Sequence, residues 1–168
     1  KRMKLEFPRD FRESLALHDG QTASEDSEPF EWLPGCSPLA PLTAIVAQWK
    51  EERDNDSDED LDEYDAKIVN VMFHPKRIPI QGTQFWDGHN KYLDLIPAKQ
   101  GSIGQVIMFT SECDMDLLGA SFREALEHYV SVLESGEWVF DRPAGRVKGK
   151  GDDADGHASS EFERWAAK

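Results

Sequence analysis

Cysteine, basic residues and long hydrophobic runs are all scarce in this sequence. Its two cysteines, Cys36 and Cys113, show no CxxC spacing, which argues against a disulfide framework or a zinc knuckle and favours a reducing compartment. No run approaches the roughly 18 apolar residues of a membrane span, and the first residues do not resemble a signal peptide. We therefore expect a cytoplasmic protein with no membrane partner.

Basic residues are outnumbered by acidic ones. The 168 residues include 19 Lys or Arg and 33 Asp or Glu, a formal net charge of −14. Such a chain repels phosphates, and no basic stripe stands out, so we expect no binding to nucleic acid. Residues 51–65 hold ten of the acids and one base, Arg53; the rest, with 18 basic and 23 acidic residues, carries only −5. We expect this acidic window to be a solvated loop or a frayed helix end.

Hydrophobic periodicity predicts three main helices. The first covers residues 9–18, the second runs from Thr43 as N-cap to Glu52, and the third follows Ser121, which forms a capping box with Glu124. Gly20 and Gly136 are expected to end the first and third helices. The apolar face of the third helix is expected to comprise Phe122, Leu126, Tyr129, Val130 and Leu133.

Short apolar segments bounded by turn residues predict strands. The expected strands are Ile68–Phe73, Ile78–Ile80, Tyr92–Leu95 and Gln105–Phe109, with a further edge strand at Trp138–Phe140. The order of elements favours an α+β fold, a single domain with a mainly antiparallel central sheet flanked by helices. We expect the domain in residues 1–140, with the acidic loop 51–65 inside it, and a Gly/Asp-rich linker and short C-terminal helix in residues 141–168.

A series of short motifs follows in order along the chain: Phe7-Pro8-Arg9-Asp10-Phe11, Leu17-His18-Asp19-Gly20-Gln21, His74-Pro75-x-Arg77-Ile78-Pro79-Ile80, Leu93-Asp94-Leu95-x-Pro97, Gly104-Gln105-Val106-Ile107 and Leu133-Glu134-x-Gly136-Glu137-Trp138. Together these motifs resemble the SUKH superfamily, and within it the Smi/Knr-type family of bacterial toxin-immunity proteins and fungal cell-wall regulators. The resemblance covers roughly residues 5–140 and implies a non-catalytic α+β scaffold that docks on another protein.

Residues that could carry chemistry do not assemble into a recognisable site. Residues 54–65 imitate a calcium-binding EF-hand loop, but Glu59 replaces the required Gly and Asp65 replaces the bidentate Glu. The five histidines lack metal-ligand spacing, and no serine or cysteine lies in a nucleophile motif. We therefore expect no enzyme, no catalytic residue, no cofactor and no metal, although the acidic charge density itself is compatible with weak cation binding.

The most informative functional pattern is a loop with two aromatic residues that have no obvious core to enter. Exposed aromatics with a charged rim are typical of protein-binding hot spots; the alternative is that Trp86 folds back onto the sheet. A second acidic cluster follows in the turn before the third helix. The predicted partner-binding surface comprises Phe85, Trp86, Asp87, His89, Glu112, Asp114 and Asp116.

These observations favour an immunity protein that neutralises a cognate toxin by docking on it. The acidic charge would steer it to a basic toxin such as a nuclease. The alternative is a regulatory or scaffolding protein like the fungal cell-wall regulators. The sequence specifies neither the activity of the toxin nor the oligomeric state.

Overall fold

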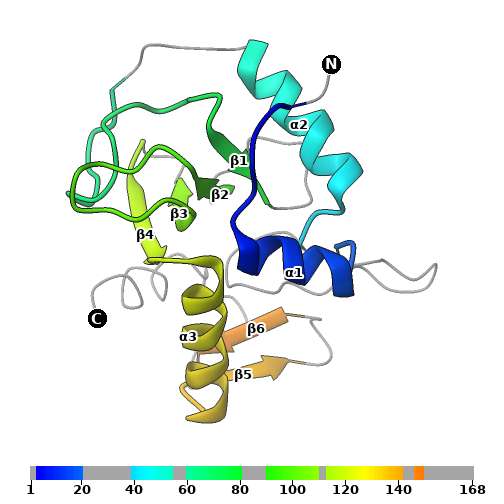
Figure 1. The fold of residues 1–168 in the computed structure, drawn as a ribbon. Coiled ribbons are helices and arrows are strands. Elements are labelled where there is room, and N and C mark those ends of the chain that lie inside the picture. The colour runs from blue at the N-terminus through cyan, green and yellow to red at the C-terminus, as the bar shows by residue number, and fades with distance from the viewer. Residues whose placement is uncertain are drawn as a thin grey trace.

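The computed structural model describes residues 3–20, 39–54, 60–80, 90–109, 113–141 and 146–149. The helices there are α1 (Arg9–Leu17), α2 (Leu42–Asp54) and α3 (Phe122–Glu134). The strands of the central sheet are β1 (Arg77–Pro79), β2 (Asn90–Asp94), β3 (Gln105–Phe109) and β4 (Met115–Gly119), arranged in chain order with every neighbouring pair antiparallel (Figure 1). The expected α+β class and antiparallel sheet are therefore confirmed.

The two faces of the sheet are covered in different ways. Phe11 of α1, Ile45 of α2 and Phe122 of α3 pack in one core cluster with residues of the sheet that include Leu93 and Val106. A second cluster brings residues of β2, β3 and β4 against the irregular chain before β1; its members are Leu61, Ile68, Met72, Tyr92, Ile107, Phe109 and Met115. The sheet thus lies between a helical layer and a layer without regular structure.

Helix α3 begins and ends as the sequence predicts. The Ser121 hydroxyl accepts a hydrogen bond from the Glu124 backbone at 3.1 Å, and Gly136 has a φ of 72°. A further cap comes from α1, because Asp10 Oδ2 accepts a hydrogen bond from the backbone N–H of Arg123 at 2.9 Å. One residue was wrongly assigned to the apolar face of this helix. Val130 is 46% exposed, and the helix buries Ala125 and Val132 instead.

The start of α2 was predicted incorrectly. Thr43 is not the N-cap, because the helix begins at Leu42. The carboxylate of Asp19 accepts a hydrogen bond from the Leu42 N–H at 2.7 Å. This satisfies a helix N-terminal donor from 23 residues away. No pattern local to residues 39–45 could reveal a cap supplied by a distant residue.

Residues 68–73, which we expected as a strand, form no strand. They pass through bends, because several of their carbonyl groups bind a buried arginine instead of a neighbouring strand, as described below. The sheet gains β4 instead, which the sequence analysis did not predict. Asp116 consequently lies inside a strand, paired with Met108 of β3, and not in a turn.

The C-terminal part of the described chain also differs from expectation. Strand β5 (Trp138–Asp141) does not join the central sheet but pairs with β6 (Arg146–Gly149) in a separate antiparallel hairpin. Strand β6 therefore lies within the segment 141–168 that we predicted as a linker. The helix predicted near the C-terminus lies outside the described residues. In the ranges described, no helix combines the length and the hydrophobicity needed to cross a membrane.

Two glycines with positive φ provide a matched pair for testing the packing of the N-terminal segment. Gly104 has a φ of 88°, and a Cβ there would overlap with the ring of Pro8; Gly136 has a φ of 72°, but a Cβ there would meet nothing within 4 Å. We expect Gly136→Ala to cost about 1 kcal/mol for backbone strain alone. Gly104→Ala should cost about 1–3 kcal/mol more, because the overlap adds to the same strain.

Urea unfolding of both variants measures this difference. Equal losses of unfolding free energy would show that Pro8 yields easily and that the N-terminal segment is not fixed against the sheet.

Candidate functional site

The structure describes only part of the predicted partner-binding surface. Phe85, Trp86, Asp87, His89 and Glu112 lie outside the described residues. Asp114 and Asp116 are described, and both are partly buried.

The strand register places the attachment points of these segments together. Asn90, which directly follows residues 81–89, pairs with Phe109, which directly precedes residues 110–112. Phe109 pairs in turn with Met115 at the start of β4. The aromatic segment and the acidic turn are thus joined to the same end of the sheet, which we call the loop end (Asn90, Phe109 and Met115).

The acidic window contributes to this end as well. Its acidic side chains are solvated as expected, since Asp60, Asp62 and Glu63 are exposed, but the backbone of residues 62–65 is fixed along the outer edge of β4. Asp62 N donates to Cys113 O at 3.1 Å, Met115 N donates to Glu63 O at 2.8 Å, and Tyr64 forms an isolated parallel bridge with Met115. The carboxylate of Asp114 accepts a hydrogen bond from Glu63 N at 3.1 Å. Asp114 therefore fixes acidic residues at the loop end of the sheet, and the Tyr64 side chain stays 44% exposed there.

A buried lysine lies one residue from the loop end. Lys91 of β2 is only 1% exposed, and its strand partner Met108 is also the partner of Asp116. Directly paired residues of neighbouring strands point to the same face, so Lys91, Met108 and Asp116 form a row across the sheet. Nothing in the sequence indicated that Lys91 is buried, because a lysine between a polar and an aromatic residue is expected to face solvent.

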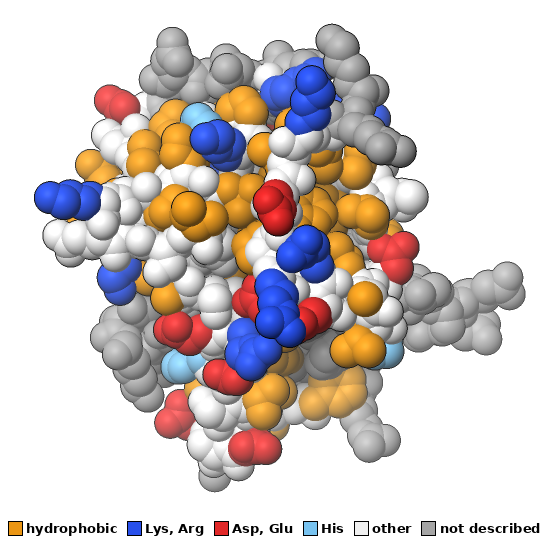
Figure 2. Space-filling model, in the orientation of Figure 1, with side chains coloured by type: hydrophobic (Ala, Val, Ile, Leu, Met, Phe, Trp, Pro, Cys, Tyr) orange, Lys and Arg blue, Asp and Glu red, His pale blue; other side chains and the backbone are white. Residues whose placement is uncertain are grey.

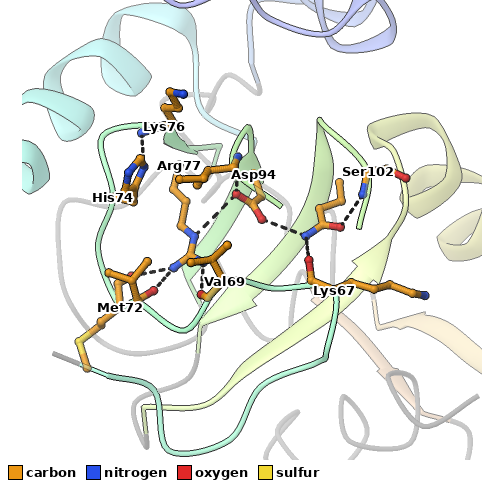
Figure 3. A network of polar contacts seen from close by, with 11 residues as sticks. Lys67, Val69, Met72, His74, Lys76, Arg77, Asp94 and Ser102 are labelled. Atoms are coloured by element: carbon orange, nitrogen blue, oxygen red, sulfur yellow. Dashed lines mark hydrogen bonds and ion pairs between the residues drawn. The ribbon is translucent and has the colours of Figure 1, made fainter. Parts of the chain in front are cut away.

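A buried polar network centres on Arg77 of β1 (Figure 3). Its guanidinium donates to the carbonyl oxygens of Val69 (2.8 Å), Met72 (3.3 Å) and Val71. Its Nε lies 3.8 Å from Asp94 Oδ1 of β2. Both side chains are fully enclosed, and burial lowers the pKa of Arg77 while the Asp94 carboxylate opposes that change. Arg77 thus holds the irregular layer against the sheet.

Gln105 extends the network to β3. Its amide nitrogen donates to Asp94 Oδ2 at 2.9 Å and to Lys67 O at 3.0 Å, and its oxygen accepts from Ser102 N at 3.1 Å. The arginine, carboxylate and amide are therefore committed to the backbone of neighbouring segments. A buried ion pair with this many backbone partners organises a fold.

A small cleft lies between α2, β2 and the chain before β1. The space that solvent can enter there is only about 10 Å³, room for about one water molecule. Trp49 forms one wall, where its indole N–H donates to Pro75 O at 2.7 Å and the Arg53 guanidinium lies 5.1 Å from the ring centre. The other lining residues are Glu52, Met72, Phe73, His74, Arg77 and Tyr92.

Glu52 is the unusual group of this cleft. The side chain is 8% exposed, and its Oε1 accepts hydrogen bonds from Gln48 Nε2 at 3.0 Å and from the Tyr92 hydroxyl at 3.3 Å. Burial raises the pKa of Glu52 to about 7, although both hydrogen bonds oppose the increase. Burial also raises the pKa of Tyr92, so that Tyr92 stays a neutral donor. The sequence placed Glu52 in the solvated window and gave no signal of its burial.

The face shown in Figure 2 is not uniformly charged. Lys and Arg side chains lie along its middle with Asp and Glu side chains beside them, and hydrophobic side chains gather around both. In the part of the chain that the structure describes, no group of three or more His, Cys, Asp or Glu side chains is placed to hold a metal ion. Ser121 is a helix cap, and Cys113 precedes β4 with a φ of 65°.

Removing the arginine of the buried pair should destabilise the fold strongly. We expect Arg77→Met to lower the free energy of unfolding by about 3–5 kcal/mol, because Asp94 loses its counter-charge and three carbonyl groups lose a donor. Arg9→Met is the matched control, since Arg9 forms an ion pair with Glu13 on the surface and should show no measurable loss. Chemical denaturation gives both values; equal effects would refute the role assigned to Arg77.

Neutralising Glu52 should stabilise the protein above pH 7. The pKa in the folded state exceeds the ordinary value of 4.5, so the stability present below pH 4.5 is lost as the pH rises through about 7. Glu52→Gln removes this loss and should add up to about 3 kcal/mol at pH 8 but little at pH 4. Thermal unfolding from pH 4 to pH 8 tests this; a gain that does not change with pH would contradict it.

Comparison with known proteins identifies the family. The chain matches the SMI1 / KNR4 family (SUKH-1) over residues 1–128. It is 28% identical over 156 residues to the cell wall biosynthesis/cell cycle regulator smi1 of Schizosaccharomyces pombe, a match that covers 83% of this chain and 30% of that protein. It is also 32% identical over 84 residues to a glucan synthesis regulatory protein of Neurospora crassa, covering 49% of this chain and 15% of that protein.

The chain thus spans less than a third of the length of either relative. The family match agrees with the resemblance drawn from the sequence motifs and covers well over half of the 168 residues. The chain belongs to the SMI1 / KNR4 family (SUKH-1).

Proposed function

We propose that this chain is a non-catalytic, cytoplasmic protein-interaction domain that acts in the regulation of cell-wall biosynthesis. The observation that carries the interaction role is the convergence at the loop end of the sheet. There the attachment points of the aromatic segment 81–89 and of the turn 110–112 adjoin the acidic residues 60–65 along β4. The process is inferred from the two relatives, whose names describe regulators of cell-wall and glucan synthesis.

The use of polar groups supports binding over catalysis. Arg77, Asp94 and Gln105 form hydrogen bonds with backbone groups and Gln105 also binds Asp94, whereas Ser121 caps a helix. The acids at the loop end instead surround an exposed aromatic, Tyr64, on a backbone fixed by hydrogen bonds to β4. A rigid backbone that presents an aromatic side chain with a charged rim suits protein recognition, because little conformational entropy is lost on binding.

The charge of the chain suggests the kind of partner. Ten acids in residues 51–65 would attract a basic surface and accelerate association, an effect that fades as salt screens it. Phe85, Trp86, Asp87 and His89, with Glu112, Asp114 and Asp116, remain the proposed contact residues. Because Asp114 also holds Glu63 in place, its loss would disturb the surface as well as a contact.

The second candidate is an immunity protein that neutralises a cognate toxin, such as a nuclease. The observation that favours it is the same acidic charge, since toxins that bind nucleic acid present basic surfaces that an acidic inhibitor could cover. It differs from the first candidate in its partner: a single basic toxin with a strong affinity, in place of components that control cell-wall synthesis.

Affinity purification from the native host separates the two candidates. We expect the full tagged chain to retain a basic partner at low salt, and the Trp86→Ala variant to lose most of it. Glu127→Gln, on the exposed side of α3, is the matched control and should retain the partner. A partner with a role in cell-wall synthesis supports the first candidate, and a single small basic toxin supports the second. Retention by Trp86→Ala equal to wild type would refute the proposed surface.

A further inference from the structure

The two halves of α2 are held in place by different interactions. Ile45 and Trp49 belong to the helical core cluster, so apolar packing fixes the first three turns. In residues 50–53 the only buried side chain is Glu52. Its Oε1 accepts hydrogen bonds from Gln48 Nε2 at 3.0 Å and from the Tyr92 hydroxyl of β2 at 3.3 Å. The last turn of α2 is therefore attached to the sheet through one carboxyl group.

No opposite charge compensates this carboxyl group. The charged or titratable side chains around it, from every element packed there, are Glu51 and Arg53 of α2, His74 of the chain before β1, Arg77 of β1 and Tyr92 of β2. Arg77 lies beside Asp94, and among the described residues no Lys, Arg or His side chain forms an ion pair with Glu52. Because Glu52 is only 8% exposed, the docked helix end favours its neutral form.

The position of Glu52 in the chain adds to this preference. The last turn of a helix disfavours a negative charge, because the helix dipole is negative there. Glu52 also lies among the ten acids of residues 51–65, and Glu51 raises its pKa further while burial is the main cause of the value of about 7. Ionisation of Glu52 therefore favours a state in which its side chain faces water.

The other end of the acidic window is held without a titrating group. Leu61 N donates to the side-chain oxygen of Asn70 at 2.8 Å, and Asp62 N donates to Cys113 O at 3.1 Å. These bonds join amide groups, which keep their protonation state near neutral pH. The two attachments of the window thus differ, because only the one at Glu52 joins a group that titrates near pH 7.

We propose that the last turn of α2 is a pH-sensitive switch, docked on Tyr92 while Glu52 carries a proton and unwound into solvent when Glu52 ionises. The proton passes to solvent at the cleft, which admits about one water molecule. Release frees the N-terminal attachment of the acidic window, whereas Ile45 and the bonds of Leu61 and Asp62 stay in place. The switch goes beyond the proposed function and requires neither a partner nor a role in cell-wall synthesis.

The pH range of the switch follows from the two states of Glu52. Its pKa is about 7 when docked and returns toward the ordinary 4.5 when released. The ratio of released to docked molecules should therefore rise by up to about tenfold per pH unit between these values, or about 300-fold in total. Below pH 4.5 and above about pH 7 the ratio should no longer change.

Amide hydrogen exchange of the ¹⁵N-labelled full chain, followed by NMR at pH 5, 6, 7 and 8, tests the switch. Each observed rate is divided into the intrinsic rate at the same pH, which gives a protection factor for each amide. We expect protection of residues 50–53 to fall at least about tenfold from pH 5 to pH 7 and to level off by pH 8. Protection of residues 45–47 and of β2 should stay constant.

Three variants assign the effect to one carboxyl group. Glu52→Gln keeps an oxygen acceptor but cannot ionise, so residues 50–53 should keep the protection that wild type has at pH 5 throughout the range. Glu51→Gln is the matched control, because Glu51 is exposed in the same turn, and it should retain the pH dependence. His74→Asn should retain it as well, which separates the carboxyl from the neighbouring imidazole.

The possible outcomes each decide the proposal. Constant protection of residues 50–53 in wild type, or an unchanged pH dependence in Glu52→Gln, overturns the switch. An equal fall in residues 45–47 and β2 also overturns it, because that result shows unfolding of the whole domain. A fall confined to the last turn of α2 and abolished by Glu52→Gln supports the switch, whether or not Trp86 captures a partner.

Discussion

The guanidinium of Arg77 is buried between the central sheet and a layer of chain that has no regular structure. It donates to the carbonyl groups of Val69, Val71 and Met72 and lies beside the Asp94 carboxylate. Backbone carbonyls buried without partners are costly, so an irregular segment can cover a sheet only if something binds its polar groups. Arg77 supplies those hydrogen bonds, and Gln105 does the same for Lys67. The second hydrophobic cluster, the cleft beside Trp49 and the strand-like path of residues 60–65 all depend on the position of this layer.

This arrangement divides the polar residues of the molecule into two groups. The buried group binds backbone and fixes the fold, whereas the exposed acidic residues Asp60, Asp62 and Glu63 beside Tyr64 face solvent. These acidic residues lie on the irregular chain between α2 and β1. A domain built in this way can change its recognition surface without changing its helices, because the sheet and the helical face form a separate core.

The parts of the fold that were predicted correctly are those with local signals. The capping box at Ser121, the apolar spacing of α1 and the continuous apolar run of β3 each identify an element from a few neighbouring residues. The errors arose where a distant group decides the local structure. Asp19 sets the start of α2, and Arg77 binds the carbonyl groups of residues 68–73 so that these residues do not pair as a strand. Strand β4 was missed because its sequence mixes polar and apolar residues, and only its pairing with β3 makes it a strand. At the candidate site, the pairing of β2 with β3 places the attachment points of residues 81–89 and 110–112 at the same end of the sheet. Burial of Glu52 and Lys91 was not predictable, because a charged residue enters a core only through contacts made by other segments.

Amide hydrogen exchange of wild type and Arg77→Lys, compared by mass spectrometry under conditions where both are folded, tests most directly whether Arg77 holds the irregular layer. Lysine keeps the charge near Asp94 but cannot reach three carbonyl groups with a planar fork. We expect exchange to accelerate about tenfold or more in peptides covering residues 61–76, with β2 and β3 unchanged, as local opening without global unfolding requires. Unchanged exchange in residues 61–76, or an equal acceleration throughout the sheet, would contradict this account.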